Sequence, residues 1–272
     1  MPHGKTLWCK WPCTFLLLIS VLFGHAEVRA QGKEIRIAAA ADLKFAMGVL
    51  SEKFEQQTGT RVNVTYGSSG NFFSQLQNGA PFDLFFSADI EYPRKLESAG
   101  LTEPGTLYEY AVGRIVIWAA ADSKVDFAKL GWQALLDTSV EKIAIANPEH
   151  TPYGRAAVAA LQKAGIYESV KAKLVYGENI SQAAQFVQSG NAQAGILAKS
   201  LAVPPAMQDG KRWEIPAEMH PPLEQGAVIL KDAKNKDAAR AFLEFVKSES
   251  GRGTLAKYGF ELPEKPKQAE KR

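Results

Sequence analysis

The chain is short of cysteine, since its 272 residues include only Cys9 and Cys13. Both precede an apolar stretch near the N-terminus, which follows two lysines and gives way to small residues. This arrangement predicts a secretory signal peptide over residues 1–30, cleaved after Ala30 or Ala26. The mature chain is then expected to be secreted and free of cysteine. That excludes a disulfide, and it excludes a lipid on a cysteine at the cleavage point.

Long apolar runs and an excess of one charge are also missing. No later segment approaches the roughly 18 apolar residues of a membrane-spanning helix, so we expect no membrane-embedded part. The formal charge of +3 falls to about +1 without residues 1–30, and the remaining basic character gathers in residues 264–272. We expect that tail to be disordered. Without a basic stripe, nucleic acid is not an expected partner.

Groups that usually carry catalysis or bind metals are few. Only His150 and His220 remain after the signal peptide, and neither pairs with carboxylates at a metal-binding spacing. The turn Gly67-Ser68-Ser69-Gly70 lacks the G-x-S-x-G pattern of a nucleophilic serine. The sequence therefore argues against an enzyme, and against any metal except one carried within an oxyanion.

Apolar segments alternate with helical patterns along the mature chain. Strands are expected over residues 34–40, 61–66, 84–86, 115–119, 142–146, 174–176, 194–197 and 227–230. Helices are expected over about 42–57, from 68–69 onward, over 87–100 and 151–163, from 179 onward, and over 238–247 and 251–258. This rhythm predicts an α/β fold of parallel, helix-covered sheets. About 240 residues are enough for two lobes.

The segment from Tyr66 to Asp89 carries the most functional information. It begins with a turn that contains Ser68 and Ser69 and continues directly into a helical pattern. The first N–H groups of a helix have no partner inside the helix, and with the two hydroxyl groups they form a candidate anion site. The alternative is that one serine simply caps the helix.

Similar turns recur along the chain. Four helices are expected to start at Ala41-Asp42, Ser68-Ser69, Pro152-Tyr153 and Asn179-Ile180. Ligands of open parallel sheets bind at the carboxyl ends of the strands, so two facing sheets would direct all four helix starts into one small volume. Partial positive charge without mobile Lys or Arg suits a small, permanently deprotonated oxyanion. The alternative is four ordinary capped turns.

Five segments resemble periplasmic molybdate-binding proteins of ABC importers. They are AAAADLKFAM, YGSSGNFFSQLQNGAPFDLFFSAD, NPEHTPYGRAA, GENISQAAQFVQSGNAQAGI and KYGFELP, in the family's order from about residue 34 to 263. The resemblance implies a two-lobed periplasmic binding-protein fold with the ligand cleft between the lobes. It also implies a periplasmic monomer without a cofactor, which binds molybdate or tungstate and delivers it to a membrane permease and ATPase.

The resemblance also implies lobe boundaries and ligand contacts. The first lobe is expected to comprise residues 31–112 and 227–263, and the second lobe residues 113–226. Strands over about 111–119 and 225–230 would cross between them. Ligand contacts are expected at Ala41, Asp42, Ser69, Tyr153 and Ile180, with Ser68 and Asn179 as further candidates. Tyr153 and Ile180 would act mainly through their backbone N–H groups.

Two positions depart from some members of that family. Ala198 stands where some members have a tyrosine, and Ala41-Asp42 stands where some have a hydroxyl residue. A carboxylate beside a dianion is repelled, so either Asp42 caps its own helix or it accepts a proton from the ligand. The second reading favours hydrogen phosphate. The alternatives are therefore another tetrahedral oxyanion, such as phosphate or sulfate, or a secreted sensor module.

Overall fold

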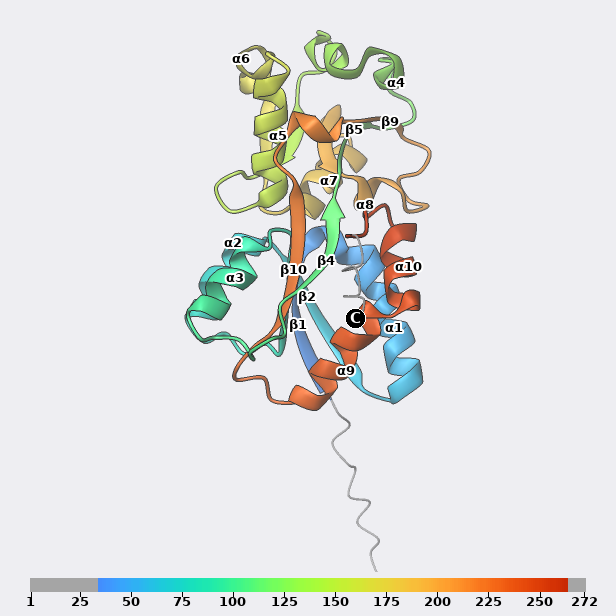
Figure 1. Cartoon of the computed structure of the whole chain (residues 1–272). Helices are drawn as coiled ribbons and strands as arrows, with labels where there is room; N and C mark the ends of the chain where they lie inside the picture. The colour runs from blue at the N-terminus through green and yellow to red at the C-terminus, as the bar shows by residue number, and fades with distance from the viewer. Residues whose placement is uncertain (1–33, 264–272) are drawn as a thin grey trace, which may run out of the picture. The chain divides into compact units, whose positions relative to one another are not determined.

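A computed structural model describes residues 34–263, which fold around two five-stranded sheets (Figure 1). The predicted signal peptide and C-terminal tail lie outside the described residues. The strand orders are β2-β1-β3-β10-β4 and β7-β6-β8-β5-β9. In both sheets the first three strands are parallel, and the last two each run antiparallel to the strand before. The two sheets thus share one topology.

The first sheet and its helices are built from both ends of the described chain. The strands are β1 (Glu34–Ala40), β2 (Arg61–Gly67), β3 (Leu84–Ser87), β4 (Tyr108–Gly113) and β10 (Leu223–Ile229). The helices are η1 (Ala41–Leu43), α1 (Lys44–Thr58), α2 (Ser69–Gln77), α3 (Glu91–Ser98), α9 (Lys236–Lys247) and α10 (Glu249–Lys257).

The second sheet and its helices come from the middle of the chain. The strands are β5 (Ile115–Ala119), β6 (Ile143–Ala146), β7 (Leu174–Gly177), β8 (Ala194–Ala198) and β9 (Lys211–Glu214). The helices are α4 (Phe127–Leu130), η2 (Gly131–Leu136), α5 (Pro152–Lys163), α6 (Tyr167–Val170), η3 (Lys171–Lys173), α7 (Ile180–Gln188), α8 (Lys199–Ala202) and η4 (Ala217–Met219).

Each sheet is covered by helices on its apolar faces. Successive residues of a strand point to opposite faces, so Ile37 packs with α1, α9 and α10 while Ala38 packs with α2 and α3. Figure 1 shows these helix groups on opposite sides of the first sheet. Phe242 of α9 contacts Phe54 of α1 edge-on, with ring centroids 5.1 Å apart. Buried faces of this kind fix the strand ends, and with them the turns that follow.

Several expectations need correction. The α/β class is confirmed, but the sheets are mixed, because β4, β5, β9 and β10 run antiparallel to their neighbours. The apolar run over residues 111–119 is two strands in two sheets, joined at Arg114. The return strand β10 pairs with β4 from Leu223 onward. The proposed lobe boundaries at 112/113 and 226/227 stay a prediction.

Within residues 34–263, no helix is both long and apolar enough to cross a membrane.

Candidate functional site

The turns after five parallel strands meet around one small cavity. Its lining residues are Ala40, Ala41, Asp42, Gly67, Ser68, Ser69, Ala88, Thr151, Pro152, Tyr153, Asn179 and Ile180. They follow β1, β2 and β3 of the first sheet, and β6 and β7 of the second. All seven residues expected from the sequence are therefore brought together, although their contact with a ligand stays a prediction. The cavity measures about 10 Å³, room for about one water-sized sphere.

The start of α2 brings two hydroxyl groups and the Ser69 amide to the lining of this cavity. Ser68 is the N-cap, and its Oγ accepts a hydrogen bond from the Asn71 N–H at 3.2 Å. Ser69 is the first helical residue, and its Oγ accepts from the Ala88 N–H at 2.9 Å. Because each Oγ acts as an acceptor in these bonds, each hydroxyl hydrogen can still be donated to a ligand. The capping role and the donor role of this turn are thus compatible.

The second sheet contributes two capped helix starts. Thr151 caps α5 by accepting from the Gly154 N–H, and Asn179 caps α7 by accepting from the Ser181 and Gln182 N–H groups. Tyr153 and Ile180 lie within the first two residues of these helices, where an N–H has no partner inside the helix. Both residues are nearly fully buried. Their amides can serve as donors in a volume from which water is largely excluded.

Asp42 is the one acidic residue among those lining the cavity, and it is 1% exposed. Its Oδ2 accepts hydrogen bonds from the Tyr153 hydroxyl at 2.9 Å and from Gln225 Nε2 at 2.7 Å. No side-chain capping bond is made at the start of η1 or α1 within the described chain. The expectation that Asp42 caps its own helix is therefore wrong, because its carboxylate is engaged by the facing α5 and by β10.

The surroundings of Asp42 change its ionisation. Burial raises the pKa of Asp42 from 3.8 to about 6, although the hydrogen bonds from Gln225 and Tyr153 and the nearby backbone N–H groups of Asp42 and Leu43 act in the opposite direction. Burial, together with the Asp42 charge, also raises the pKa of Tyr153 well above its usual value of 10.0, so its phenol stays protonated and can donate. The cavity therefore holds a carboxyl group that titrates close to neutral pH.

Gln225 links this carboxyl group to the first sheet. It is fully buried, and its Oε1 lies 2.7 Å from the hydroxyl of buried Tyr110. The Ser200 hydroxyl donates to the Asp42 carbonyl at 2.8 Å, two residues after Ala198 at the end of β8. No sequence motif marks Gln225, Tyr110 or Ser200. Each is one polar residue in a short element, which does not reveal its partner.

The charge around the cavity is unusual for an anion site. No Lys or Arg is among the residues that line it, so the favourable potential comes from helix starts, amides and hydroxyl groups. Nor do residues 34–263 contain a group of three or more His, Cys, Asp or Glu residues able to hold a metal ion. The arrangement can therefore bind a small anion through neutral donors.

Residues 35–261 match the family model for bacterial extracellular solute-binding proteins. The chain belongs to this family. The solute-binding protein is 38% identical over 247 residues to the molybdate-binding protein ModA of Azotobacter vinelandii, covering 90% of this chain and 97% of that one. It is 37% identical over 242 residues to ModA of Rhodobacter capsulatus, covering 89% and 93% of the two chains.

A solved structure agrees with these sequence matches. The solute-binding protein superposes on the periplasmic molybdate-binding protein of Azotobacter vinelandii with a TM-score of 0.79 and 31% identity, covering 84% of this chain and 99% of that one. The two-lobed α/β fold of this family is thereby confirmed.

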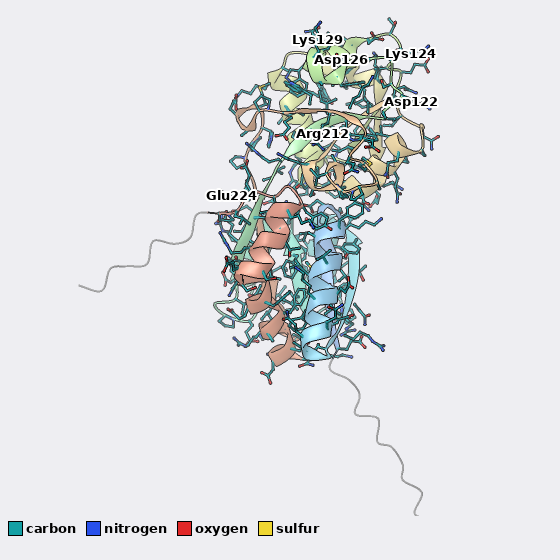
Figure 2. The ribbon with its side chains drawn as sticks, turned by 90° about the vertical axis from the view of Figure 1, so that its right-hand side faces the viewer. Asp122, Lys124, Asp126, Lys129, Arg212 and Glu224 are labelled. Carbon is teal, nitrogen blue, oxygen red and sulfur yellow. The ribbon has the colours of Figure 1, made fainter. Side chains whose placement is uncertain are left out.

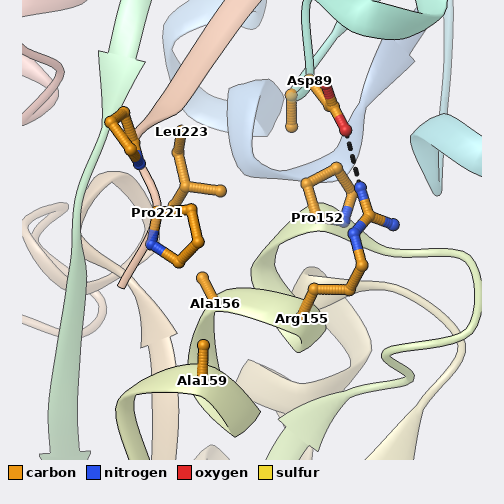
Figure 3. Close-up of a pocket in the computed structure, with 9 residues that line it drawn as sticks. Asp89, Pro152, Arg155, Ala156, Ala159, Pro221 and Leu223 are labelled. Atoms are coloured by element: carbon orange, nitrogen blue, oxygen red, sulfur yellow. Dashed lines mark hydrogen bonds and ion pairs between the residues drawn. The ribbon is translucent and has the colours of Figure 1, made fainter. Parts of the chain in front are cut away.

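A larger cavity lies beside the small one in this solute-binding protein. It measures about 300 Å³ and is lined mainly by small or apolar residues, with Asp89 and Arg155 at one side (Figure 3). These two residues come from opposite lobes and form an ion pair of 2.6 Å. Because they satisfy each other and no polar group converges on the rest of the space, this cavity is not the better candidate for an anion.

Further contacts join the lobes at the rim of the small cavity. The Gly70 N–H donates to the His150 carbonyl at 3.0 Å. Next to it, Asn71 Nδ2 donates to Glu178 Oε1 at 2.6 Å. In this structure the two lobes of the solute-binding protein therefore touch around the site.

Proposed function

We propose that this solute-binding protein captures one molybdate or tungstate ion per chain in the periplasm and delivers it to an ABC permease and ATPase. The observation that carries the proposal is the convergence of donors at the ends of facing strands, with the hydroxyl of Ser69 and the amides of Tyr153 and Ile180 around one cavity. The relatives described above, which are molybdate-binding proteins, support the same ligand.

Neutral donors suit a tetrahedral dianion. Amides and hydroxyl groups held by helices need no reorganisation when the ion arrives, and helix starts add partial positive charge. The caps made by Ser68, Thr151 and Asn179 hold these donors in place. Selectivity over sulfate is expected from cavity size, because the competing ions share charge and shape.

Capture also requires motion. The cavity has room for about one water-sized sphere, whereas a tetrahedral oxyanion has four oxygen atoms. The lobes must therefore separate to admit the ion and settle around it with slightly wider spacing. A ligand that contacts both lobes only in the closed form shifts the population toward closure. Small-angle scattering should show compaction on saturation.

Two alternative functions make different predictions. A phosphate- or sulfate-binding protein would prefer those ions, and a sensor module would present its closed form to a receptor instead of a permease. We propose no reaction at the site, and the chain is expected to act as a monomer without nucleic acid. Periplasmic location depends on the predicted signal peptide over residues 1–30.

Isothermal titration calorimetry with molybdate, tungstate, sulfate and phosphate tests the proposal. We expect one molybdate or tungstate per chain, bound far more tightly than sulfate in competition. Sulfate binding as tightly as molybdate would contradict the proposed selectivity, and preferential phosphate binding would support the alternative oxyanion.

A further inference from the structure

One buried oxygen of Asp42 has no hydrogen-bond partner within the described chain. Its Oδ2 is engaged by Tyr153 and Gln225, but its Oδ1 is buried and unpartnered. Buried polar atoms are rarely left unpaired, and those that are commonly mark a missing ligand atom or water. Because Asp42 lines the same cavity as Ser69 and Ile180, the missing partner of Oδ1 belongs to the anion site.

Chemistry limits what that partner can be. An ionised carboxylate is only an acceptor, whereas a protonated one donates through its hydroxyl. A fully deprotonated oxyanion also offers only acceptors. If both were ionised in one desolvated cavity, acceptor would face acceptor and negative charge would face negative charge. One proton placed between Oδ1 and an anion oxygen removes both conflicts.

We propose that this site binds its oxyanion together with one proton, held between Asp42 Oδ1 and an oxygen of the anion. The inference rests on the proposed function. For molybdate the proton comes from solvent and stays on the carboxyl group, which then donates to the anion. For hydrogen phosphate the ligand brings the proton on one of its own oxygens, and that O–H group donates a hydrogen bond to the carboxylate. No covalent bond forms or breaks except the O–H bond of the proton that is taken up.

The other groups facing Asp42 cannot take this role. Tyr153 from α5 and Tyr110 from β4 both have a pKa raised well above 10.0, mainly by burial, so they stay neutral. Gln225 from β10 and Ser200 from α8 do not titrate in this range.

Nearby charges are also accounted for. Lys199, beside Ser200, is paired with Glu214 at 2.7 Å, and Arg155 is paired with Asp89. Lys44, two residues after Asp42, is exposed. Burial has already raised the pKa of Asp42 to about 6 before any anion is present, and a dianion would raise it further. Asp42 is therefore the group that takes up the proton.

The test is molybdate titration calorimetry on the full mature chain from about pH 6 to about pH 8.5, in pairs of buffers with different ionisation enthalpies. We expect the wild type to take up close to one proton per molybdate near pH 8, and its affinity to fall about tenfold per pH unit over the upper part of this range. This measurement needs no variant, so it stands even if a substitution destabilises the fold.

A variant of Asp42 and a control variant then test whether Asp42 is the group that takes up the proton. Asp42→Asn should abolish proton uptake, flatten the pH profile and bind molybdate at least about tenfold more tightly than the wild type near pH 8. The same variant should weaken hydrogen phosphate binding, because the amide nitrogen or oxygen cannot replace the carboxylate acceptor with its charge. Asp122→Asn is the matched control. It removes one negative charge from an exposed turn after β5 and should keep the wild-type slope (Figure 2).

The outcomes separate this inference from the proposed function. Tight molybdate binding with no proton uptake and no pH dependence would overturn the inference and leave the function standing. An Asp42→Asn variant that keeps the wild-type slope would also overturn it. If neither the wild type nor Asp122→Asn binds molybdate at any pH, the proposed function fails, and the inference fails with it.

Discussion

The two lobes contact each other in two different ways, in the interior and at the rim. In the interior, the carboxyl group of Asp42 meets the neutral donor Tyr153 of the other lobe, beside Gln225 of its own sheet. All three residues are nearly fully buried. At the rim, Asp89 meets Arg155, with side chains 27% and 42% exposed. Water and salt screen the rim pair, but they do not reach the interior group. The interior should therefore decide what is bound, while charged rim contacts should contribute little.

Ser69→Ala tests the interior with the largest expected effect. The variant keeps the Ser69 amide but removes a hydroxyl that can donate to the anion. The loss of one charge-assisted hydrogen bond should cost about 1.5–3 kcal/mol of molybdate affinity, roughly ten- to a hundredfold in Kd by calorimetry. It also removes the acceptor of the Ala88 N–H, so thermal stability should fall. Ser74→Ala, at an exposed position of the same helix, is the control. Unchanged affinity in Ser69→Ala would remove the serine turn from the site.

Gly70→Ala tests whether steric contact at the rim, as opposed to charge, affects closure of the two lobes. A Cβ on Gly70 would lie 2.7 Å from the His150 carbonyl oxygen and 3.0 Å from the Tyr92 hydroxyl, so the closed form would have to shift. Overpacking of this kind costs about 1–3 kcal/mol, which should weaken molybdate binding up to about a hundredfold. The substitution favours the helix itself, so stability without ligand should not fall.

Gly48→Ala is the matched control for that prediction. Gly48 lies in the middle of α1, and a Cβ there would have no atom within 4 Å. Gly48→Ala should stabilise α1 by about 0.4–1 kcal/mol, as Gly70→Ala should stabilise α2, and it should leave molybdate affinity unchanged. Equal affinities of the two glycine variants would show that the rim does not restrict closure.

Tyr153→Phe removes one donor from the interior carboxyl group while keeping the backbone amide. The wild-type pKa of Asp42 is raised from 3.8 to about 6, so its contribution to stability is full below pH 3.8 and is lost as pH rises through 6. The total loss is about 3 kcal/mol on this shift. Without the tyrosine hydroxyl the pKa should rise further, since that bond lowers it.

Because Gln225 Nε2 also donates to the Tyr153 hydroxyl at 2.9 Å, the variant should already be less stable than the wild type near about pH 4. The difference should widen by about 1–2 kcal/mol near neutral pH in denaturant titrations. Tyr176→Phe, at an exposed position of β7, should show no such divergence. A constant difference at all pH values would mean that the hydroxyl does not act on the charge of Asp42.

Arg155→Gln should give the smallest effect. It removes the ion pair with Asp89, and exposed pairs contribute about 0.2–1 kcal/mol. We expect molybdate affinity to change by less than about fivefold, with the difference shrinking at high salt. Arg94→Gln breaks an exposed pair within α3 that does not join the lobes, so affinity should not change. A loss as large as that of Ser69→Ala would reverse the proposed roles of interior and rim.

The sequence allowed much of this site to be predicted, because its parts are local. The Gly-Ser-Ser-Gly turn, the cap at Thr151 and the cap at Asn179 each depend on a few adjacent residues, and strand ends in parallel sheets bring such turns together. The position of the Asp42 carboxyl group could not be predicted in this way. It depends on Gln225, 183 residues away, and a single Gln next to Glu224 in β10 gives no pattern to follow.

In the fold, too, most features set by adjacent residues were predictable, and features set by distant pairing were not. The longer helices with caps and the strands with apolar runs were predicted, whereas the four-residue helix α4 was not, although Asp126 caps it. The strand β9 (Lys211–Glu214) was also missed, because it is a short edge strand with alternating polar residues. The run over residues 111–119 was read as one strand, because local pattern does not reveal that Gly113 and Ile115 pair with different sheets.

The shared topology of the two sheets has a consequence for ligand shape. Strands β1 and β2 occupy the same places in the first sheet as β6 and β7 in the second. The turns that carry Asp42 and Ser69 therefore take the same places in the topology as those that carry Tyr153 and Ile180. A tetrahedron has two-fold axes, so each half of the protein can address one pair of oxygen atoms. Each half thus offers the ion a corresponding pair of turns, and the proposed proton lies where the aspartate of one pair faces the tyrosine of the other.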